Sequence, residues 1–180
     1  MRILSFILGL VFMWFMGTGC EKEYYFAPSD QPVFFEYHYL NHAWGVADNG
    51  WFIDSEGQQR GFSFPEEYRW PDSTGHISLE DLTYNLGQTD TILHSLSHKE
   101  FEKHIRLIKG AADGIISDPK AVGADMGSAA LSCYAYDPAT GTYQHVLLAA
   151  VGSWERFNRS AEAEKLVDWL KDLGGTRLFD

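Results

Sequence analysis

The chain has 180 residues, of which 25 are acidic and 14 are basic, so its formal net charge is −11. Nucleic acids and anionic lipid headgroups attract basic surfaces, and this charge balance argues against both as partners. A chain of this length, with 45% hydrophobic residues, can bury a core in one domain without disulfide bonds.

The first segment has the three parts of a secretory signal peptide. Arg2 supplies a positive charge, residues 3–15 are almost entirely apolar, and the small residues Gly17, Thr18 and Gly19 follow. The apolar stretch is shorter than the roughly 20 residues that span a bilayer. The sequence therefore predicts export with residues 1–19 as the signal peptide, rather than a stable transmembrane helix.

The small residues that precede Cys20 make this segment resemble the signal of bacterial lipoproteins, particularly the relaxed signals of Bacteroidetes-like bacteria. The resemblance implies that Cys20 is acylated and becomes the first residue of the mature chain, at the outer membrane or cell surface. Residues 20–31 then form an acidic tether, and residues 32–180 form a single domain. Loss of residues 1–19 removes Arg2 and no acidic residue, which leaves 13 basic and 25 acidic residues.

The only other cysteine is Cys133. It lies in the alternating segment 128–136, where it shares one strand face with Leu131 and Ala135. Free cysteine often behaves as a small buried hydrophobe, and no neighbouring residue in the sequence would stabilise a thiolate. We expect Cys133 to be buried and unreactive.

Two blocks of sequence are typical of antiparallel strands. Residues 33–46 are rich in aromatic and β-branched residues, with a bend expected near Asn41, and the pair Asn49-Gly50 predicts a tight hairpin turn. Strands over 51–54 and 60–64 follow, joined by a turn at 54–57. In the second block, residues 128–136 and 142–151 flank a turn and predict another hairpin, whose second strand is central and covered by a helix.

Three helices are predicted to begin after serine N-caps at Ser78, Ser97 and Ser160. The last of them carries an apolar stripe and ends at Gly174-Gly175. The segments 65–77 and 113–127 have the composition of loops. We therefore expect an α+β fold with an antiparallel sheet of about five strands and three helices packed mainly on one face.

No pattern in the sequence predicts a metal site, a cofactor site or a catalytic residue. Glu36, His38 and His42 would share a strand face, but residues two apart on a strand lie about 6–7 Å apart, too far for one ion, so we expect a half-exposed polar surface. A helix N-cap at Ser97 separates His94 from His98. EF-hand, nucleophile-elbow and phosphate-loop patterns are also missing from the sequence.

Aromatic residues interleaved with acids suggest a ligand surface. The candidate ligand-binding residues are Trp44, Trp51, Trp70, Asp54 and Asp72. Glycan sites use aromatic faces for stacking and carboxylates for hydrogen bonds, although aromatic residues also fill the core of a sheet packed on helices. Trp70, which lies before a proline in a polar loop, is the residue least easily explained by core packing.

The sequence thus predicts a lipid-anchored protein of the cell envelope or surface, with a binding role rather than an enzymatic one. One alternative is a surface lipoprotein that binds or hydrolyses glycans. Another is an inhibitor or immunity-type lipoprotein whose acidic loops bind a basic protein.

Mass spectrometry of the mature N-terminus tests the anchor directly. We expect a first residue at Cys20 with the added mass of acyl chains. An unmodified peptide that runs through Cys20 would refute acylation.

Overall fold

The computed structural model describes residues 25, 27–43, 45–177 and 179. The fold is α+β, with a nine-stranded sheet in the order β5-β3-β2-β1-β7-β8-β9-β6 and with β4 paired to β8. The strands are β1 (Val33–Asn41), β2 (Ala47–Asp54), β3 (Gln58–Ser63), β4 (His76–Ile77), β5 (Thr91–Ser95), β6 (Lys120–Ala121), β7 (Ser128–Asp137), β8 (Thr142–Gly152) and β9 (Trp154–Phe157). Every pairing is antiparallel.

The helices are α2 (Leu79–Gly87), α3 (His98–Ile105), α4 (Ile108–Ala112) and α5 (Ala161–Asp172). All three predicted serine caps are confirmed, because the side chains of Ser78, Ser97 and Ser160 each accept a hydrogen bond from a backbone amide of the first turn. The segment predicted as one helix after Ser97 is divided into α3 and α4.

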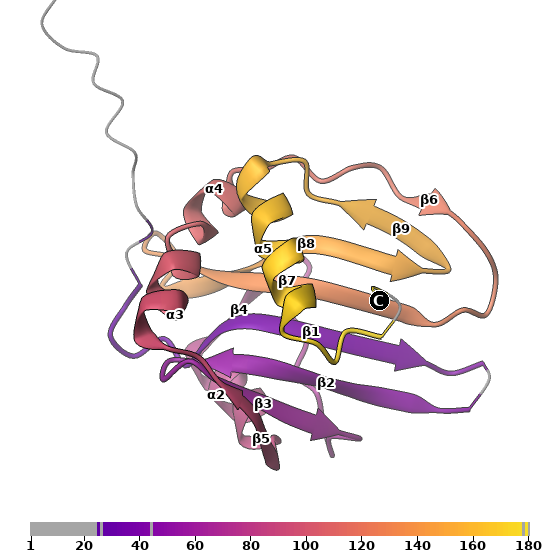
Figure 1. Cartoon of the computed structure of the whole chain (residues 1–180), viewed down its shortest axis with the longest axis horizontal. Helices are drawn as coiled ribbons and strands as arrows, with labels where there is room; N and C mark the ends of the chain where they lie inside the picture. The colour runs from indigo at the N-terminus through magenta and orange to yellow at the C-terminus, as the bar shows by residue number, and fades with distance from the viewer. Residues whose placement is uncertain (1–24, 26, 44, 178, 180) are drawn as a thin grey trace, which may run out of the picture.

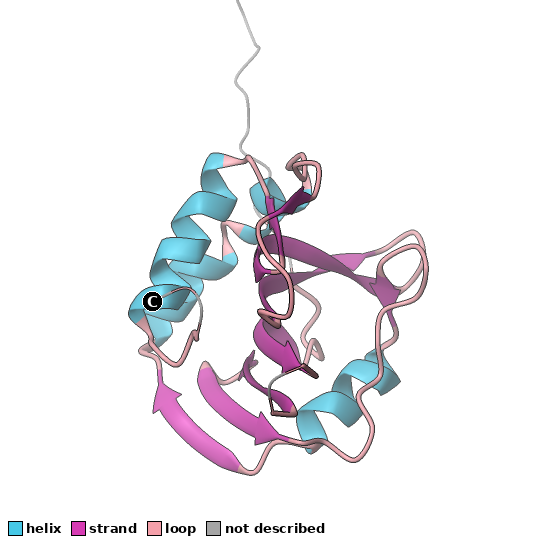
Figure 2. Cartoon of the chain, turned by 90° about the vertical axis from the view of Figure 1, so that its right-hand side faces the viewer, coloured by secondary structure: helices cyan, strands magenta, loops and turns pink. Residues whose placement is uncertain are grey.

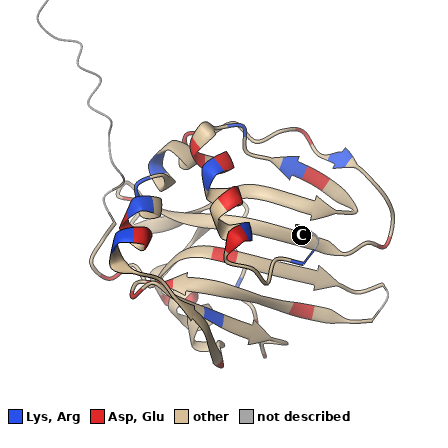
Figure 3. Ribbon diagram, viewed as in Figure 1, with Lys and Arg blue, Asp and Glu red and all other residues tan. Residues whose placement is uncertain are grey.

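The sheet has an apolar core on each face. On one face, α3, α4 and α5 cover a large core that includes Phe35, Leu131, Leu148 and Leu166 (Figure 1). On the other face, α2 covers a smaller core that includes Phe52 (Figure 2). The charged residues lie largely on the helices and near strand ends, and the long central strands carry few (Figure 3).

The sheet is larger than the predicted five strands, since β4, β5, β6 and β9 were not expected. These strands are short, and β5 has every residue exposed, so neither length nor alternation distinguishes them from loops. The predicted turn at Asn49-Gly50 is wrong, because both residues lie within β2 and pair with β1. The bend expected near Asn41 coincides with the end of β1.

Cys133 is buried and free, as predicted. It faces the core beneath the helices, and burial raises the pKa of its thiol well above the usual range. Among the described residues, no helix is long and apolar enough to cross a membrane.

The packed part of the chain begins before the expected boundary at residue 32. The hydroxyl of Tyr25 contacts the side-chain oxygen of Gln31 and accepts a hydrogen bond of 2.7 Å from the backbone amide of Tyr136. Gln31 is 1% exposed, and its side-chain amide donates to the carbonyl oxygens of Val33 and Tyr134 at 2.9 and 3.0 Å. The end of the predicted tether is therefore part of the domain.

Replacement Gln31→Ala would leave the carbonyl groups of Val33 and Tyr134 without this donor. We expect the free energy of unfolding to fall by about 2 kcal/mol, as for other unsatisfied buried polar groups. Urea denaturation would measure the change, with the exposed Ser29→Ala as the control that stays within about 0.5 kcal/mol of the parent. Equal stability of the parent protein, Gln31→Ala and Ser29→Ala would show that Gln31 does not contribute to the stability of the domain.

Candidate functional site

A cluster of ionisable side chains lies on the sheet face opposite α3, α4 and α5. The cluster consists of Glu36 and His38 on β1, Asp48 on β2, Tyr68 and Trp70 in the loop before β4, Tyr134 on β7 and His145 on β8. We call this set the Glu36 cluster. Alternation along β1 directs Glu36 and His38 to this face, while Phe35 and Tyr37 enter the larger core.

The carboxylate of Glu36 is the centre of the cluster. Glu36 is 3% exposed, and its two oxygens accept hydrogen bonds from the hydroxyl groups of Tyr68 and Tyr134, the latter at 2.5 Å. His145 Nε2 lies 3.6 Å from the same oxygen that Tyr134 contacts. A buried carboxylate is costly unless it is paired and hydrogen-bonded, and four segments of the chain meet that need here.

His38 lies between two carboxylates and is 6% exposed. Its Nε2 contacts Asp48 Oδ1 at 2.7 Å. Its Nδ1 lies 3.4 Å from Glu36 Oε1 in an alignment unsuitable for a hydrogen bond, so this contact is an ion pair only. The arrangement favours the imidazolium form of His38.

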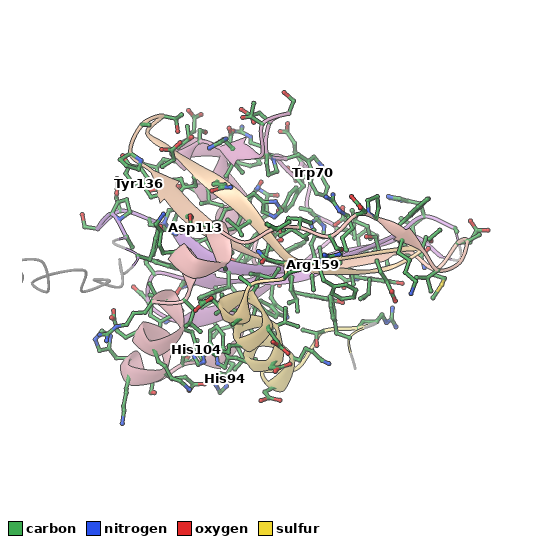
Figure 4. The ribbon with its side chains drawn as sticks, turned by 90° about the horizontal axis from the view of Figure 1, so that it is seen from above. Trp70, His94, His104, Asp113, Tyr136 and Arg159 are labelled. Atoms are coloured by element: carbon green, nitrogen blue, oxygen red, sulfur yellow. The ribbon has the colours of Figure 1, made fainter. Side chains whose placement is uncertain are left out.

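Trp70 covers His38 from the solvent side. The two rings are parallel within 3°, with centroids 5.2 Å apart, and Tyr68 lies against both of them at 4.5 Å. Trp70 is nevertheless 58% exposed, so the face of its indole away from His38 is open to solvent. Figure 4 shows Trp70 and His104 on opposite sides of the sheet.

Gly50 leaves room for this packing. It pairs with His38 across the β1–β2 ladder, and a Cβ atom there would lie 2.0 Å from the carbonyl oxygen of Tyr37 and 2.8 Å from the ring of Phe62. The Phe62 ring instead meets His38 edge to face, with centroids 5.2 Å apart. Asn49-Gly50, which was interpreted as a turn, is thus part of strand β2, and position 50 requires glycine.

The pKa shifts follow from these contacts. Burial acts to raise the pKa of Glu36, but the contacts with His145 and His38 outweigh it and hold the pKa well below its usual range. Burial acts to lower the pKa of His38, but Glu36 and Asp48 outweigh it and raise the pKa. Burial and the charge of Glu36 raise the pKa of both Tyr68 and Tyr134, which keeps these phenols as neutral donors.

This geometry suits a rigid support better than proton transfer. Glu36 is held ionised with both oxygens engaged, so it is neither a proton donor nor an exposed base. In the described part of the chain, no three His, Cys, Asp or Glu side chains are placed to hold a metal ion. The groups of the cluster that reach solvent include the outer face of Trp70 and part of Tyr68. The side chains of Asp48 and His145 are 25% and 27% exposed, respectively.

The residues predicted as ligand contacts do not lie together. Trp51 is 2% exposed and packs in the core under the helices, away from the Glu36 cluster. Asp54 is 4% exposed, pairs with Arg60 at 2.5 Å and accepts backbone hydrogen bonds in the β2–β3 turn, so its carboxylate is engaged within the fold. Asp72 shapes an exposed turn by accepting hydrogen bonds from Thr74 and His76.

Trp70 is the predicted residue that lies at the Glu36 cluster with an exposed ring. Trp44 and Cys20 lie outside the described residues. The half-exposed surface expected for Glu36, His38 and His42 is wrong for the first two, which are buried, whereas His42 is exposed.

Comparison with known proteins finds no matching family model, no matching curated protein and no matching solved structure.

The pKa shifts predict how stability depends on pH. Because the pKa of His38 is raised, its contribution to folding is complete below the unfolded-state value of about 6.5 and is lost as pH rises through the folded-state value. For Glu36, whose pKa is lowered, the contribution is present above about 4.3 and is lost as pH falls through the folded-state value. We expect the free energy of unfolding, measured by urea denaturation, to fall as pH rises above about 6.5. His38→Gln should abolish that fall, and at pH 6 it should lower the free energy of unfolding by about 3 kcal/mol.

His104→Gln provides the matched control. His104 stacks on Trp169, and burial lowers the pKa of its imidazole, so its contribution is present above about pH 6.5 and is lost as pH falls below that value. The fall in the free energy of unfolding above about pH 6.5 should therefore persist in His104→Gln. If the free energy of unfolding of His38→Gln fell above about pH 6.5 as steeply as that of the parent, the ion pairs of His38 with Glu36 and Asp48 would be contradicted.

Proposed function

We propose that the chain is a lipid-anchored protein of the cell envelope or surface that binds glycans at the Glu36 cluster. The observation that carries the binding role is Trp70, which is 58% exposed although its inner face is held against His38. An indole fixed on one side and open on the other is suited to stacking on the apolar face of a sugar ring. Asp48 and His145 at the same surface can hydrogen-bond to hydroxyl groups.

The anchor is supported by the N-terminal sequence, in which small residues precede Cys20. Outside the signal segment, the acidic charge disfavours direct docking on anionic lipids, so the acyl chains would provide the membrane attachment. A binding role is favoured over hydrolysis because Glu36 is fully engaged, whereas a glycosidase needs two carboxyl groups free to act on the glycosidic bond.

Protein binding is the second candidate, because exposed apolar residues gather around β6 and β9. The residues are Ile115, Val122, Met126, Trp154 and Phe157, which are 43–75% exposed. Exposed apolar groups of this kind are common at protein interfaces.

Trp70→Ala tests the glycan proposal. Full-length protein in detergent micelles would be applied to an array of neutral and acidic oligosaccharides, and the Kd of the best ligand would be measured by calorimetry. We expect Trp70→Ala to weaken binding at least about tenfold, which corresponds to about 1.4 kcal/mol, and Trp70→Phe to weaken it less.

The matched control is Ile115→Ala, which removes an exposed apolar side chain away from the Glu36 cluster and should leave the Kd unchanged. The proposal would be refuted if no oligosaccharide bound the parent protein, or if Trp70→Ala bound as tightly as the parent. Loss of glycan binding in Ile115→Ala but not in Trp70→Ala would place the site elsewhere.

A further inference from the structure

The strand pairings place a row of residues beside one another across the sheet face that carries His38. Gly50 on β2 pairs with His38 on β1, His38 pairs with Ala130 on β7, Ala130 pairs with Ala150 on β8, and Ala150 pairs with Arg156 on β9. Paired residues project to the same face. A continuous line of side chains therefore runs from beneath Trp70 to β9, the strand next to the edge strand β6.

The middle of this row is low and partly open. Ala130 and Ala150 have small side chains and are only partly buried, and the neighbouring pair, Leu40 and Ser128, is partly buried and exposed, respectively. The smaller core beneath α2 lies at other positions, among them Phe52 and Tyr143. The floor of the row thus has few atoms standing above the sheet.

A second exposed tryptophan marks the far end. Trp154 lies two residues before Arg156 on β9, so alternation places both side chains on this face. Trp154 is 57% exposed. From β1 to β9 there are three steps between neighbouring strands, and at about 4.8 Å per step they separate β1 from β9 by about 14 Å.

Charge indicates what could occupy this surface. His38 is already paired with Glu36 and Asp48, while the guanidinium of Arg156 donates to the carbonyl oxygen of Ser117 at 3.4 Å and forms no ion pair with the described residues. The chain as a whole carries a charge of −11, which repels polyanions. The net charge of the chain therefore disfavours a polyanion, and Arg156 can donate hydrogen bonds to the hydroxyl oxygens of an uncharged ligand.

We propose that the ligand is an uncharged linear oligosaccharide that crosses β1, β7, β8 and β9. One sugar ring stacks on Trp70, a later ring stacks on Trp154, and Arg156 donates to hydroxyl oxygens beside Trp154. The chain between these rings lies over Ala130 and Ala150. This inference rests on the proposed glycan binding and adds the length, the charge and the direction of the ligand.

The test compares neutral oligosaccharides of increasing length, from two to eight sugars, on full-length protein by calorimetry. Affinity should rise with length until the ligand spans both tryptophans. Trp154→Ala should cost at least about tenfold for the longest ligand and leave the disaccharide unchanged, whereas Trp70→Ala should weaken both. Ala150→Gln, which raises the floor, should act like Trp154→Ala.

Phe157→Ala is the matched control on the same strand. Phe157 is 43% exposed, but it pairs with Ala149, which faces the core beneath the helices, so its loss should not change affinity for any length. Thermal denaturation would confirm that each variant is folded. Because Trp154 is exposed, Trp154→Ala decides the question even if Ala150→Gln is destabilised.

The outcomes separate this inference from the proposed function. If Trp70→Ala weakens binding at every length while Trp154→Ala and Ala150→Gln match the parent, the extended path is refuted and the glycan site at Trp70 stands. If acidic oligosaccharides bind more tightly than neutral ones and Arg156→Gln abolishes that preference, the uncharged ligand is refuted. If no oligosaccharide binds, both proposals are refuted.

Discussion

The buried carboxylate of Glu36 is the interaction on which the second face of the sheet depends. A charge at 3% exposure persists only where enough donors surround it, and its partners come from β1, β7, β8 and the loop before β4. Burial and the charge of Glu36 raise the pKa of the two phenols, which keeps them neutral, and Glu36 and Asp48 outweigh burial to raise the pKa of His38. This face is thereby held by a buried charge network beside its smaller apolar core, whereas the opposite face is held mainly by the larger apolar core.

This division explains why an exposed tryptophan can be held in one orientation. A loop residue without a core contact would ordinarily sample many rotamers, but Trp70 rests on an imidazole that is itself tied to two strands. The parallel stack of an aromatic ring on a cationic ring adds an attraction that needs no covering layer. The outer indole surface is therefore presented to solvent without the entropy cost of ordering it on binding.

Local signals in the sequence predicted the helix starts and the long strands, because a serine cap or an alternating stretch depends on near neighbours. The Glu36 cluster depends instead on contacts between distant segments. Tyr134 lies 98 positions and Tyr68 lies 32 positions from Glu36, and nothing local indicates that these phenols meet. The shared strand face of Glu36 and His38 was visible, but their burial was not. Gly50 was misinterpreted for a related reason, since the need for glycine comes from Tyr37 and Phe62 on the neighbouring strands.

The packing of Tyr25 onto the domain limits how far an anchored molecule can reach. With Cys20 acylated, only residues 20–24 separate the lipid from packed chain, and at about 3.5 Å per residue they extend no more than about 18 Å. The described chain begins near α3 and α4, while β6 and the start of β9 lie at the other end of the molecule (Figure 1). Such a short connection would keep the end near α3 and α4 at the membrane and would turn the end that carries Trp154 away from it.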